Sequence, residues 1–183
     1  MVRGNCQRVR AGKRTAVCPE PHGRTYAKGA GYAFAHAAVF LGGSCEILVG
    51  FEPETVLARL HEGGHSGTFM VPTHFHAIFA LPPAVLEKNR GVRLRSLVSN
   101  ASALPQRTKE QIVDYFGDGI LHESYGSTEA AIVTNLRPAD QLRKQQCVGR
   151  PFTMNEVKLL DEAGQPVRQG EVGELYSRSP YLF

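Results

Sequence analysis

The stretch Tyr125-Gly126-Ser127-Thr128-Glu129 gathers side chains that could contact a nucleotide and its metal ion. An aromatic ring can stack on a flat base, and hydroxyl groups can donate hydrogen bonds to phosphate oxygens. A carboxylate is a preferred ligand of a hard cation such as Mg²⁺. Without its context, the same run also fits an ordinary turn, so its meaning depends on what surrounds it.

A second segment of interest is the run of small residues from Ser99 to Leu104, which reads SNASAL. Its small side chains would let the backbone approach a flat ring closely. This segment and the first one both follow stretches with a strand-like pattern. In a parallel sheet, ligands bind just beyond the carboxyl ends of the strands, so we expect the two segments to face the same ligand.

Strand-like and helix-like segments alternate from about Gly29 onward. Strands are predicted at 45–49, 67–71, 94–98 and 120–124, and helices at 53–62, 74–81 and 105–116. The strands recur about every 25 residues with helices between them, which is typical of βαβ units. We therefore predict an α/β fold with a mostly parallel sheet and flanking helices.

The pattern changes again after Gly149. Segments 156–160 and 171–177, with a turn at 161–166, predict an antiparallel β-hairpin. We expect this hairpin to belong to a partial β-barrel subdomain that begins within residues 147–183. The α/β portion would then span residues 29–146.

Residues 1–28 account for the net charge of +4. They hold seven Lys and Arg side chains against Glu20 alone, which leaves 14 basic and 16 acidic groups for residues 29–183. A solvated, poorly ordered arm is predicted here. Such an arm could also bind nucleic acid, but Tyr26 is its one aromatic residue, so no nucleic-acid partner is predicted.

The composition, 42% hydrophobic and 21% charged, is typical of a soluble globular protein. The longest apolar run, residues 33–41, contains His36 and is too short to cross a bilayer. No signal-peptide pattern opens the chain, so a cytoplasmic location is expected. The four cysteines form no CxxC pair, which favours reduced thiols over a zinc ribbon or a disulfide framework.

Two other enzyme classes have weaker support. Residues 61–65 read HEGGH, which fits the HExxH pattern of zinc peptidases. That chemistry needs both histidines on one helical face, and two glycines disfavour a helix by about 2 kcal/mol relative to alanines. The GxSxG elbow of serine hydrolases is nowhere complete in the sequence.

The order of several motifs decides between these interpretations. The chain contains Val71-Pro72-Thr73, the 99–104 loop, YGSTE at 125–129, Val148-Gly149-Arg150-Pro151 and Gly170-Glu171-Val172-Gly173-Glu174-Leu175. In this order they resemble the middle of the large domain of the adenylate-forming (AMP-binding) superfamily, over roughly residues 29–183. The stretches YAFAHAAVFLGG and VPTHFHAIFALP resemble the acyl-CoA synthetase branch more than peptide-synthetase adenylation domains.

The resemblance implies a two-step ligation that uses ATP, Mg²⁺ and coenzyme A. A carboxylic acid, expected to be a fatty or other apolar acid, attacks the α-phosphorus of ATP, giving an acyl-adenylate and pyrophosphate. The thiol of coenzyme A then displaces AMP and leaves a thioester. Positioning and charge neutralisation would supply most of the catalysis.

The same resemblance assigns roles to individual residues. Tyr125 would stack on adenine, and the backbone of Asn100, Ala101 and Ser102 would form the opposite wall of the adenine site. Gly126 and Ser127 would lie beside the reacting carboxylate. Thr128 would bind the α-phosphate, and Glu129 would hold Mg²⁺; these two are the candidate catalytic residues.

The sequence also departs from the family pattern. The family's phosphate loop, rich in Gly, Ser and Thr and ending in Pro-Lys-Gly, would precede Gly29 and has no counterpart in residues 1–28. The family's Gly-Gly-Ala-Pro loop is replaced by a loop with Asn100 and Ser102. We therefore expect a frameshifted or truncated gene fragment that is inactive by itself. The alternative is a non-catalytic remnant that binds nucleotides or partners.

Overall fold

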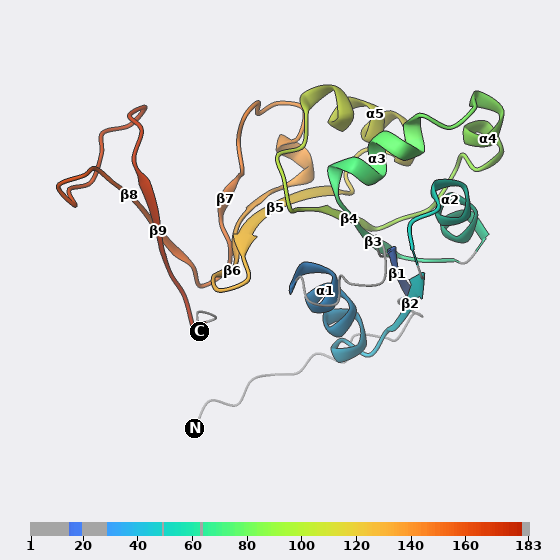
Figure 1. Cartoon of the computed structure of the whole chain (residues 1–183), viewed down its shortest axis with the longest axis horizontal. Coiled ribbons are helices and arrows are strands. Elements are labelled where there is room, and N and C mark those ends of the chain that lie inside the picture. Colours follow the sequence, from blue (N-terminus) through green and yellow to red (C-terminus); the bar gives the residue numbers. More distant parts are fainter. Residues whose placement is uncertain (1–14, 20–28, 49, 63, 181–183) are drawn as a thin grey trace.

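The computed structural model describes residues 15–19, 29–48, 50–62 and 64–180 (Figure 1). Its main sheet has seven strands in the order β2-β1-β3-β4-β5-β6-β7. The neighbouring pairs from β2 through β5 are parallel, and β6 and β7 are antiparallel to their neighbours. The strands span Thr15–Pro19 (β1), Ser44–Leu48 (β2), Gly67–Met70 (β3), Ser96–Ser99 (β4), Leu121–Ser127 (β5), Ala131–Leu136 (β6) and Arg150–Pro151 (β7).

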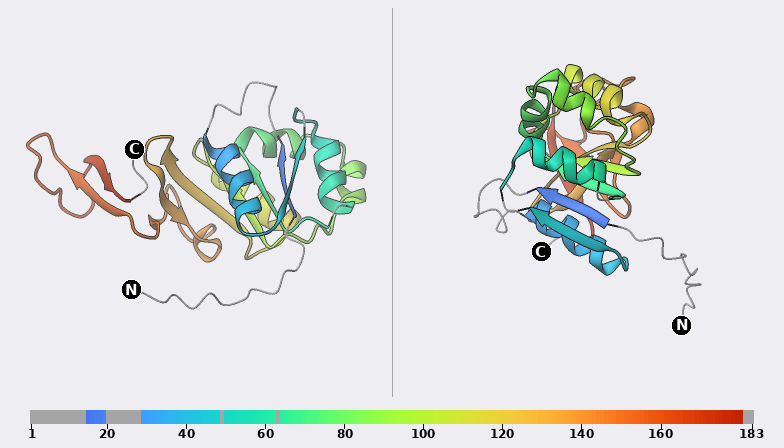
Figure 2. Two further views of the ribbon diagram at one scale, coloured as in Figure 1. Left: turned by 90° about the horizontal axis from the view of Figure 1, so that it is seen from below. Right: turned by 90° about the vertical axis from the view of Figure 1, so that its right-hand side faces the viewer.

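Helices cover both faces of this sheet. Helix α1 (Gly29–Phe40) lies on one face, and α2 (Pro53–Glu62), α3 (Pro72–Phe79), α4 (Pro83–Lys88) and α5 (Gln106–Phe116) lie on the other (Figures 1 and 2). A short 3-10 helix, η2 (Pro138–Asp140), follows β6. This layered arrangement confirms the predicted α/β class.

The core lies between the sheet and the helices of the second face. Its fully buried side chains include Leu57 of α2, Phe75 of α3 and Ile112 of α5. All four residues of β3 are buried, as expected for an inner strand of a parallel sheet that is covered on both faces. In α5, Ile112, Tyr115 and Phe116 recur at helical spacing and face this core, which explains why the sequence pattern predicts this helix well.

The predicted arm at residues 1–28 is wrong in part. Within it, Thr15–Pro19 forms β1, which pairs with β2 on one side and with β3 on the other. The strand is too short, and too close to basic residues, for its own pattern to identify it; the partners that stabilise it lie about 30 to 50 residues away. The rest of the predicted arm, residues 1–14 and 20–28, lies outside the described residues.

The C-terminal part also differs in its boundary. Strand β7 adds to the main sheet by pairing with β6, so the main sheet extends past residue 146 to Pro151. The predicted hairpin is confirmed: β8 (Glu156–Leu160) pairs antiparallel with β9 (Glu174–Arg178), and the hairpin projects from the sheet (Figure 1). Its membership of a partial β-barrel stays a prediction.

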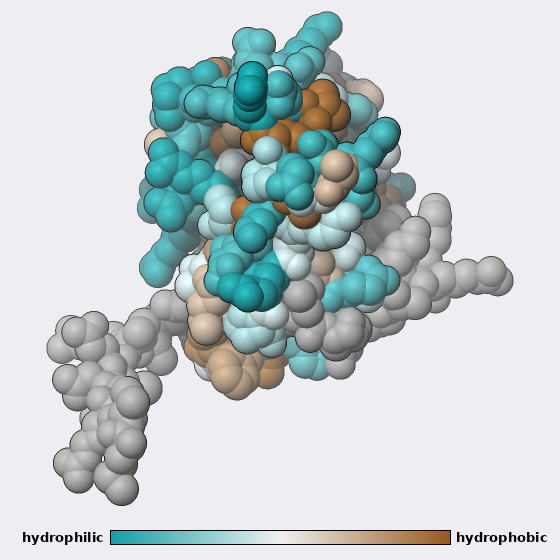
Figure 3. Space-filling view, turned by 90° about the vertical axis from the view of Figure 1, so that its left-hand side faces the viewer, coloured by the Kyte–Doolittle hydropathy of each residue, from teal (hydrophilic) through white to brown (hydrophobic). Residues whose placement is uncertain are grey.

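In the part of the chain that the structure describes, no helix has both the length and the apolar character needed to cross a membrane. Many of the coloured residues in Figure 3 are hydrophilic, and apolar areas are visible near the top and at the bottom of this face. Exposed apolar side chains include Val39, Phe40 and Leu41 at the end of α1.

Candidate functional site

Strands β4 and β5 bring the two candidate segments side by side. They pair in parallel, with Ser99 opposite Glu123. The loop after β4, residues 100–104, therefore begins next to Ser124 and Tyr125. This confirms the expectation that the small-residue loop and the YGSTE segment lie at the same edge of the sheet.

A side-chain contact fixes the start of this loop. Asn100 Nδ2 donates a hydrogen bond to Ser124 Oγ at 2.8 Å, and Ser124 Oγ donates to the backbone oxygen of Ser99 at 3.5 Å. The Asn100 carboxamide oxygen also accepts a hydrogen bond from the backbone N–H of Ala101. Ala101 has φ 77°, in the left-handed region, so the loop turns sharply there. Ala101 and Ser102 are exposed, which leaves the loop accessible to a ligand.

The ring of Tyr125 is available for stacking, since 44% of the residue is exposed. Immediately after it, the β5–β6 pairing changes register between Tyr125 and Gly126. A Cβ atom at Gly126 would lie 1.8 Å from the backbone oxygen of Ala131. Only glycine allows this close approach of the two strands. The pairing of β5 with β6 therefore requires glycine at position 126, whether or not a ligand binds.

The rest of the YGSTE segment differs from the predicted position. β5 continues to Ser127 instead of ending at Ser124, and residues 128–130 form the turn into β6. The extension occurs because β6 pairs with β5 as far as Ser127 opposite Ala131, and no β6 strand was predicted. Thr128 and Glu129 are therefore exposed at the tip of a β-hairpin.

This hairpin tip holds Glu129 in its charged form. Ser127 Oγ accepts a hydrogen bond from the backbone N–H of Ala130 at 3.1 Å. The pKa of the Glu129 carboxyl is lowered, first by a hydrogen bond from its own backbone N–H and then by one from the Ser127 hydroxyl. Among the described residues, no cation lies within ion-pair distance of Glu129. An ionised and accessible carboxylate of this kind suits a Mg²⁺ ligand.

The Val148-Gly149-Arg150-Pro151 motif closes the same sheet next to β6. Thr134 Oγ1 donates to the backbone oxygen of Val148 at 2.7 Å. A Cβ at Gly149, which has φ 87°, would lie 2.1 Å from the backbone oxygen of Asn135. The motif glycine therefore allows this segment to lie directly against β6.

The HEGGH stretch does not form a zinc-peptidase helix. Helix α2 ends at Glu62, so His61 and His65 do not share a helical face. His65 is buried, and its Nε2 lies 3.1 Å from Glu46 Oε2 of β2. Burial is the main reason why the pKa of His65 is lowered. Within the described ranges, no group of three or more His, Cys, Asp or Glu side chains could hold a metal ion.

His74 of helix α3 is buried in the core. Its ring stacks on that of Phe51, with centroids 4.0 Å apart. Its Nδ1 accepts a hydrogen bond from the backbone N–H of Val71 at 3.4 Å. Burial lowers the pKa of His74 to about 4, so the ring is neutral at physiological pH.

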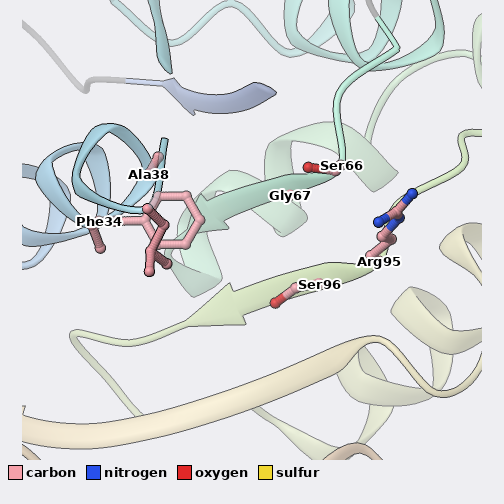
Figure 4. Close-up of a pocket in the computed structure, with 8 residues that line it drawn as sticks. Phe34, Ala38, Ser66, Gly67, Arg95 and Ser96 are labelled. Carbon is pink, nitrogen blue, oxygen red and sulfur yellow. The ribbon is translucent and has the colours of Figure 1, made fainter. Parts of the chain in front are cut away.

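A cavity of about 280 Å³ that the sequence pattern did not reveal lies between α1 and the starts of β3 and β4 (Figure 4). Apolar side chains of α1, among them Phe34 and Ala38, form one wall, and Ser66, Gly67, Arg95 and Ser96 form the other. The cavity lies at the amino ends of the strands. The YGSTE segment lies at their carboxyl ends, so the cavity is not part of the site described above.

Comparison with known proteins agrees with this geometry. The family model "AMP-binding enzyme" matches residues 25–183. A medium/long-chain-fatty-acid–CoA ligase, FadD8 from Mycobacterium tuberculosis, is 34% identical over 84% of this chain and 27% of its own length. An uncharacterized acyl–CoA ligase, YhfT from Bacillus subtilis, is 26% identical over 81% of this chain and 30% of its own length.

Solved structures show the same fold. The amide bond synthetase McbA from Marinactinospora thermotolerans superposes with a TM-score of 0.80 at 25% identity, over 93% of this chain and 34% of that one. O-succinylbenzoate coenzyme A synthetase from Bacillus subtilis, in complex with AMP, gives a TM-score of 0.76 at 20% identity, over 92% of this chain and 33% of that one.

The chain thus spans about a third of the length of these proteins, and the part it spans contains the 99–104 loop and the YGSTE hairpin. The family match extends over residues 25–183, which is most of the chain. The chain belongs to the AMP-binding enzyme family.

Proposed function

We propose that this chain carries the adenylate-binding part of an ATP-dependent acid–thiol ligase of the acyl-CoA synthetase type. The observation that carries the proposal is the Asn100–Ser124 hydrogen bond of 2.8 Å, which holds the small-residue loop against β5 one residue before Tyr125, a residue with an exposed ring. In the proposed site, the base of ATP or AMP lies between that ring and the backbone of Asn100, Ala101 and Ser102. The name of the relative FadD8 supports the ligase type.

The tip of the β5–β6 hairpin would bind the phosphate end of the nucleotide. Thr128 is exposed and offers a hydroxyl donor for the α-phosphate. Glu129 offers an ionised carboxylate for Mg²⁺, whose charge would neutralise phosphate oxygens. The Ser127 hydroxyl is bonded within the turn, so its proposed role is to orient Glu129.

The proposed reaction joins a carboxylic acid to coenzyme A through an acyl-adenylate. The carboxylate oxygen bonds to the α-phosphorus and pyrophosphate leaves; the thiol sulfur then bonds to the acyl carbon and AMP leaves. A fatty or other apolar acid is the proposed substrate class. The name of the relative FadD8, a medium/long-chain-fatty-acid–CoA ligase, supports this class.

For this chain by itself, we propose nucleotide binding without turnover. The sequence has no Gly/Ser/Thr-rich loop ending in Pro-Lys-Gly, so the β- and γ-phosphates lack the ligands that such a loop supplies. The proposed half-site would hold the base, the α-phosphate and the cation. This function is narrower than that of a complete ligase.

Titration of the chain with a fluorescent AMP analogue, with and without Mg²⁺, tests the proposal. We expect saturable binding that weakens at least about fivefold in Tyr125→Ala, since stacking on a base contributes about 1–3 kcal/mol. Tyr176→Ala, which removes an exposed tyrosine on β9, serves as the matched control. Binding that is unchanged in Tyr125→Ala would contradict the proposed site.

A second assay addresses turnover. The chain is incubated with ATP, Mg²⁺ and a panel of fatty acids, and pyrophosphate and acyl-adenylate are measured. We expect neither product from the chain alone. Measurable acyl-adenylate would contradict the proposal that this chain binds without turnover.

A further inference from the structure

A buried ion pair involves Glu123 of β5, two residues before Tyr125. Lys109 Nζ of α5 is 2.5 Å from Glu123 Oε2 of β5, and the two side chains are only 3% and 7% exposed. A buried ion pair is weak evidence for stability, because an apolar pair of similar volume is often as stable or more stable. The presence of these two charges therefore points to a role other than holding the core together.

The second carboxylate oxygen of Glu123 reaches the loop. Glu123 Oε1 accepts a hydrogen bond from the backbone N–H of Leu104 at 2.9 Å, in a buried position. One carboxylate thus connects β5, helix α5 and the end of the 100–104 loop. Hydrogen bonds to a charged acceptor are stronger than those between neutral groups, so this connection restrains the loop effectively.

The loop is therefore fixed at both ends by the two residues that precede Tyr125. Asn100, at its start, bonds to Ser124, and Leu104, at its end, bonds to Glu123. Glu123 and Tyr125 are two positions apart on one strand, so their side chains leave the same face of the sheet. The carboxylate that restrains the loop and the ring that would stack on the base are thereby positioned by the same short segment.

We propose that Lys109 and Glu123 are positioning residues that set the spacing between the ring of Tyr125 and the backbone of residues 100–102. This inference depends on the proposed function, because the spacing matters only if a purine occupies the site. Lys109 fixes the Glu123 carboxylate, and Glu123 holds the Leu104 amide. Neither side chain contacts the nucleotide.

Two double variants separate positioning from stability. Lys109→Met/Glu123→Gln removes both charges but keeps an oxygen that can accept the Leu104 N–H. Lys109→Met/Glu123→Leu removes the charges and that acceptor. Both variants avoid an unpaired buried charge, so both are expected to fold. The Leu variant leaves the buried Leu104 N–H without an acceptor, so its melting temperature should be the lower of the two.

Three measurements on the full chain follow: the melting temperature, hydrogen exchange of the Leu104 amide, and the Kd for the fluorescent AMP analogue. We expect the Gln variant to bind within about threefold of the unmodified chain. The Leu variant should bind about tenfold more weakly and exchange the Leu104 amide faster, because one hydrogen bond to a charged group is lost. A merely structural role would lower the melting temperature of the Leu variant but leave its Kd equal to that of the Gln variant at a temperature where both are folded.

The outcomes distinguish this inference from the proposed function. If the unmodified chain binds AMP and the Leu variant binds equally well, the positioning role is wrong and the proposed function stands. If the unmodified chain does not bind AMP, the proposed function fails, and the role in nucleotide binding fails with it. Should the Leu variant not fold, Glu123→Asp keeps the charge but shortens the side chain; unchanged AMP affinity in that variant would overturn the inference.

Discussion

Asn100 of the loop after β4 donates a hydrogen bond of 2.8 Å to the hydroxyl of Ser124 on β5. The contact joins two segments that are 24 positions apart in the sequence, and it does so one residue before Tyr125. The start of the loop is therefore held against the strand that carries Tyr125 in the absence of any ligand. A site that is ordered in advance loses less entropy on binding.

The carboxylate at the tip of the β5–β6 hairpin provides a first prediction. In Glu129→Gln, the affinity of the chain for ATP should lose its dependence on Mg²⁺, because a neutral amide is a weaker ligand for this cation. In a complete protein that carries this segment, pyrophosphate release should be abolished. Titrations of ATP at several Mg²⁺ concentrations measure the first effect.

Glu110→Gln serves as the control for this experiment, since Glu110 is an exposed carboxylate on α5 at a distance from the hairpin tip. It should keep the Mg²⁺ dependence of the unmodified chain. Near-normal pyrophosphate release from a complete protein with Glu129→Gln would refute the metal-binding role.

The close approach of β5 and β6 provides a second prediction. Gly126→Ala places a Cβ 1.8 Å from the backbone oxygen of Ala131 and should lower the free energy of unfolding by about 3 kcal/mol. Urea denaturation measures this difference. Gly67→Ala is the control, because its Cβ would lie 3.4 Å from the nearest atom, the backbone oxygen of Ser96. Equal stability of the two variants would show that the strands are not this close.

The backbone at Ala101 provides a third prediction. Its φ of 77° is costly for a residue with a Cβ but not for glycine. Ala101→Gly should therefore raise the free energy of unfolding by about 0.5 kcal/mol, after subtraction of the greater entropy of glycine in the unfolded chain. Urea denaturation of Ala103→Gly gives the comparison. A loss of stability in Ala101→Gly equal to that in Ala103→Gly would contradict the left-handed turn.

Three histidines provide a fourth prediction, on pH. Burial is the main cause of a lowered pKa in His65, His74 and His122, to about 4 in His74. The unfolded chain therefore takes up protons near pH 6.5, where the folded protein does not, so stability is full above pH 6.5 and decreases as the pH falls toward 4. For His74 alone the slope is at most about 1.4 kcal/mol per pH unit.

Urea denaturation at pH 7, 6 and 5 measures this loss of stability. Replacement of His74 by Leu removes one titrating group and should make the decrease shallower. His61→Leu is the control, since His61 is exposed. A variant at position 74 with the same pH dependence as the unmodified chain would be inconsistent with a buried, neutral ring.

The sequence pattern predicted those helices and strands whose own residues largely determine their structure. Helix α5 has its apolar residues at helical spacing and ends at Gly117, and β3 is a short apolar run between two helices. Strand β1 escaped prediction because its stability comes from the backbones of β2 and β3, which no property of residues 15–19 reveals. Strand β6 was not predicted, for a similar reason. Because β6 pairs with β5, β5 ends at Ser127 and not at Ser124, where the sequence pattern placed its end.

The candidate site, like the fold, could be predicted from the sequence only in part. The residue types of YGSTE indicated the chemistry of the site, and the parallel-sheet rule brought the segment next to the 99–104 loop. The hydrogen bond from the Leu104 N–H to the Glu123 carboxylate could not be predicted, because it depends on the register between β4 and β5 and on the position of α5. The close approach of Gly126 to the backbone of Ala131 likewise depends on the path of β6.

The position of β1 between β2 and β3 has a consequence for shortened forms of the protein. Backbone groups of β1 are bonded to β2 on one side and to β3 on the other. A version of the chain that begins after Pro19 would leave the edge of β3 unpaired and separate β2 from the sheet. Unpaired, largely apolar strand edges associate with one another, so such a version should precipitate instead of behaving as a smaller soluble domain.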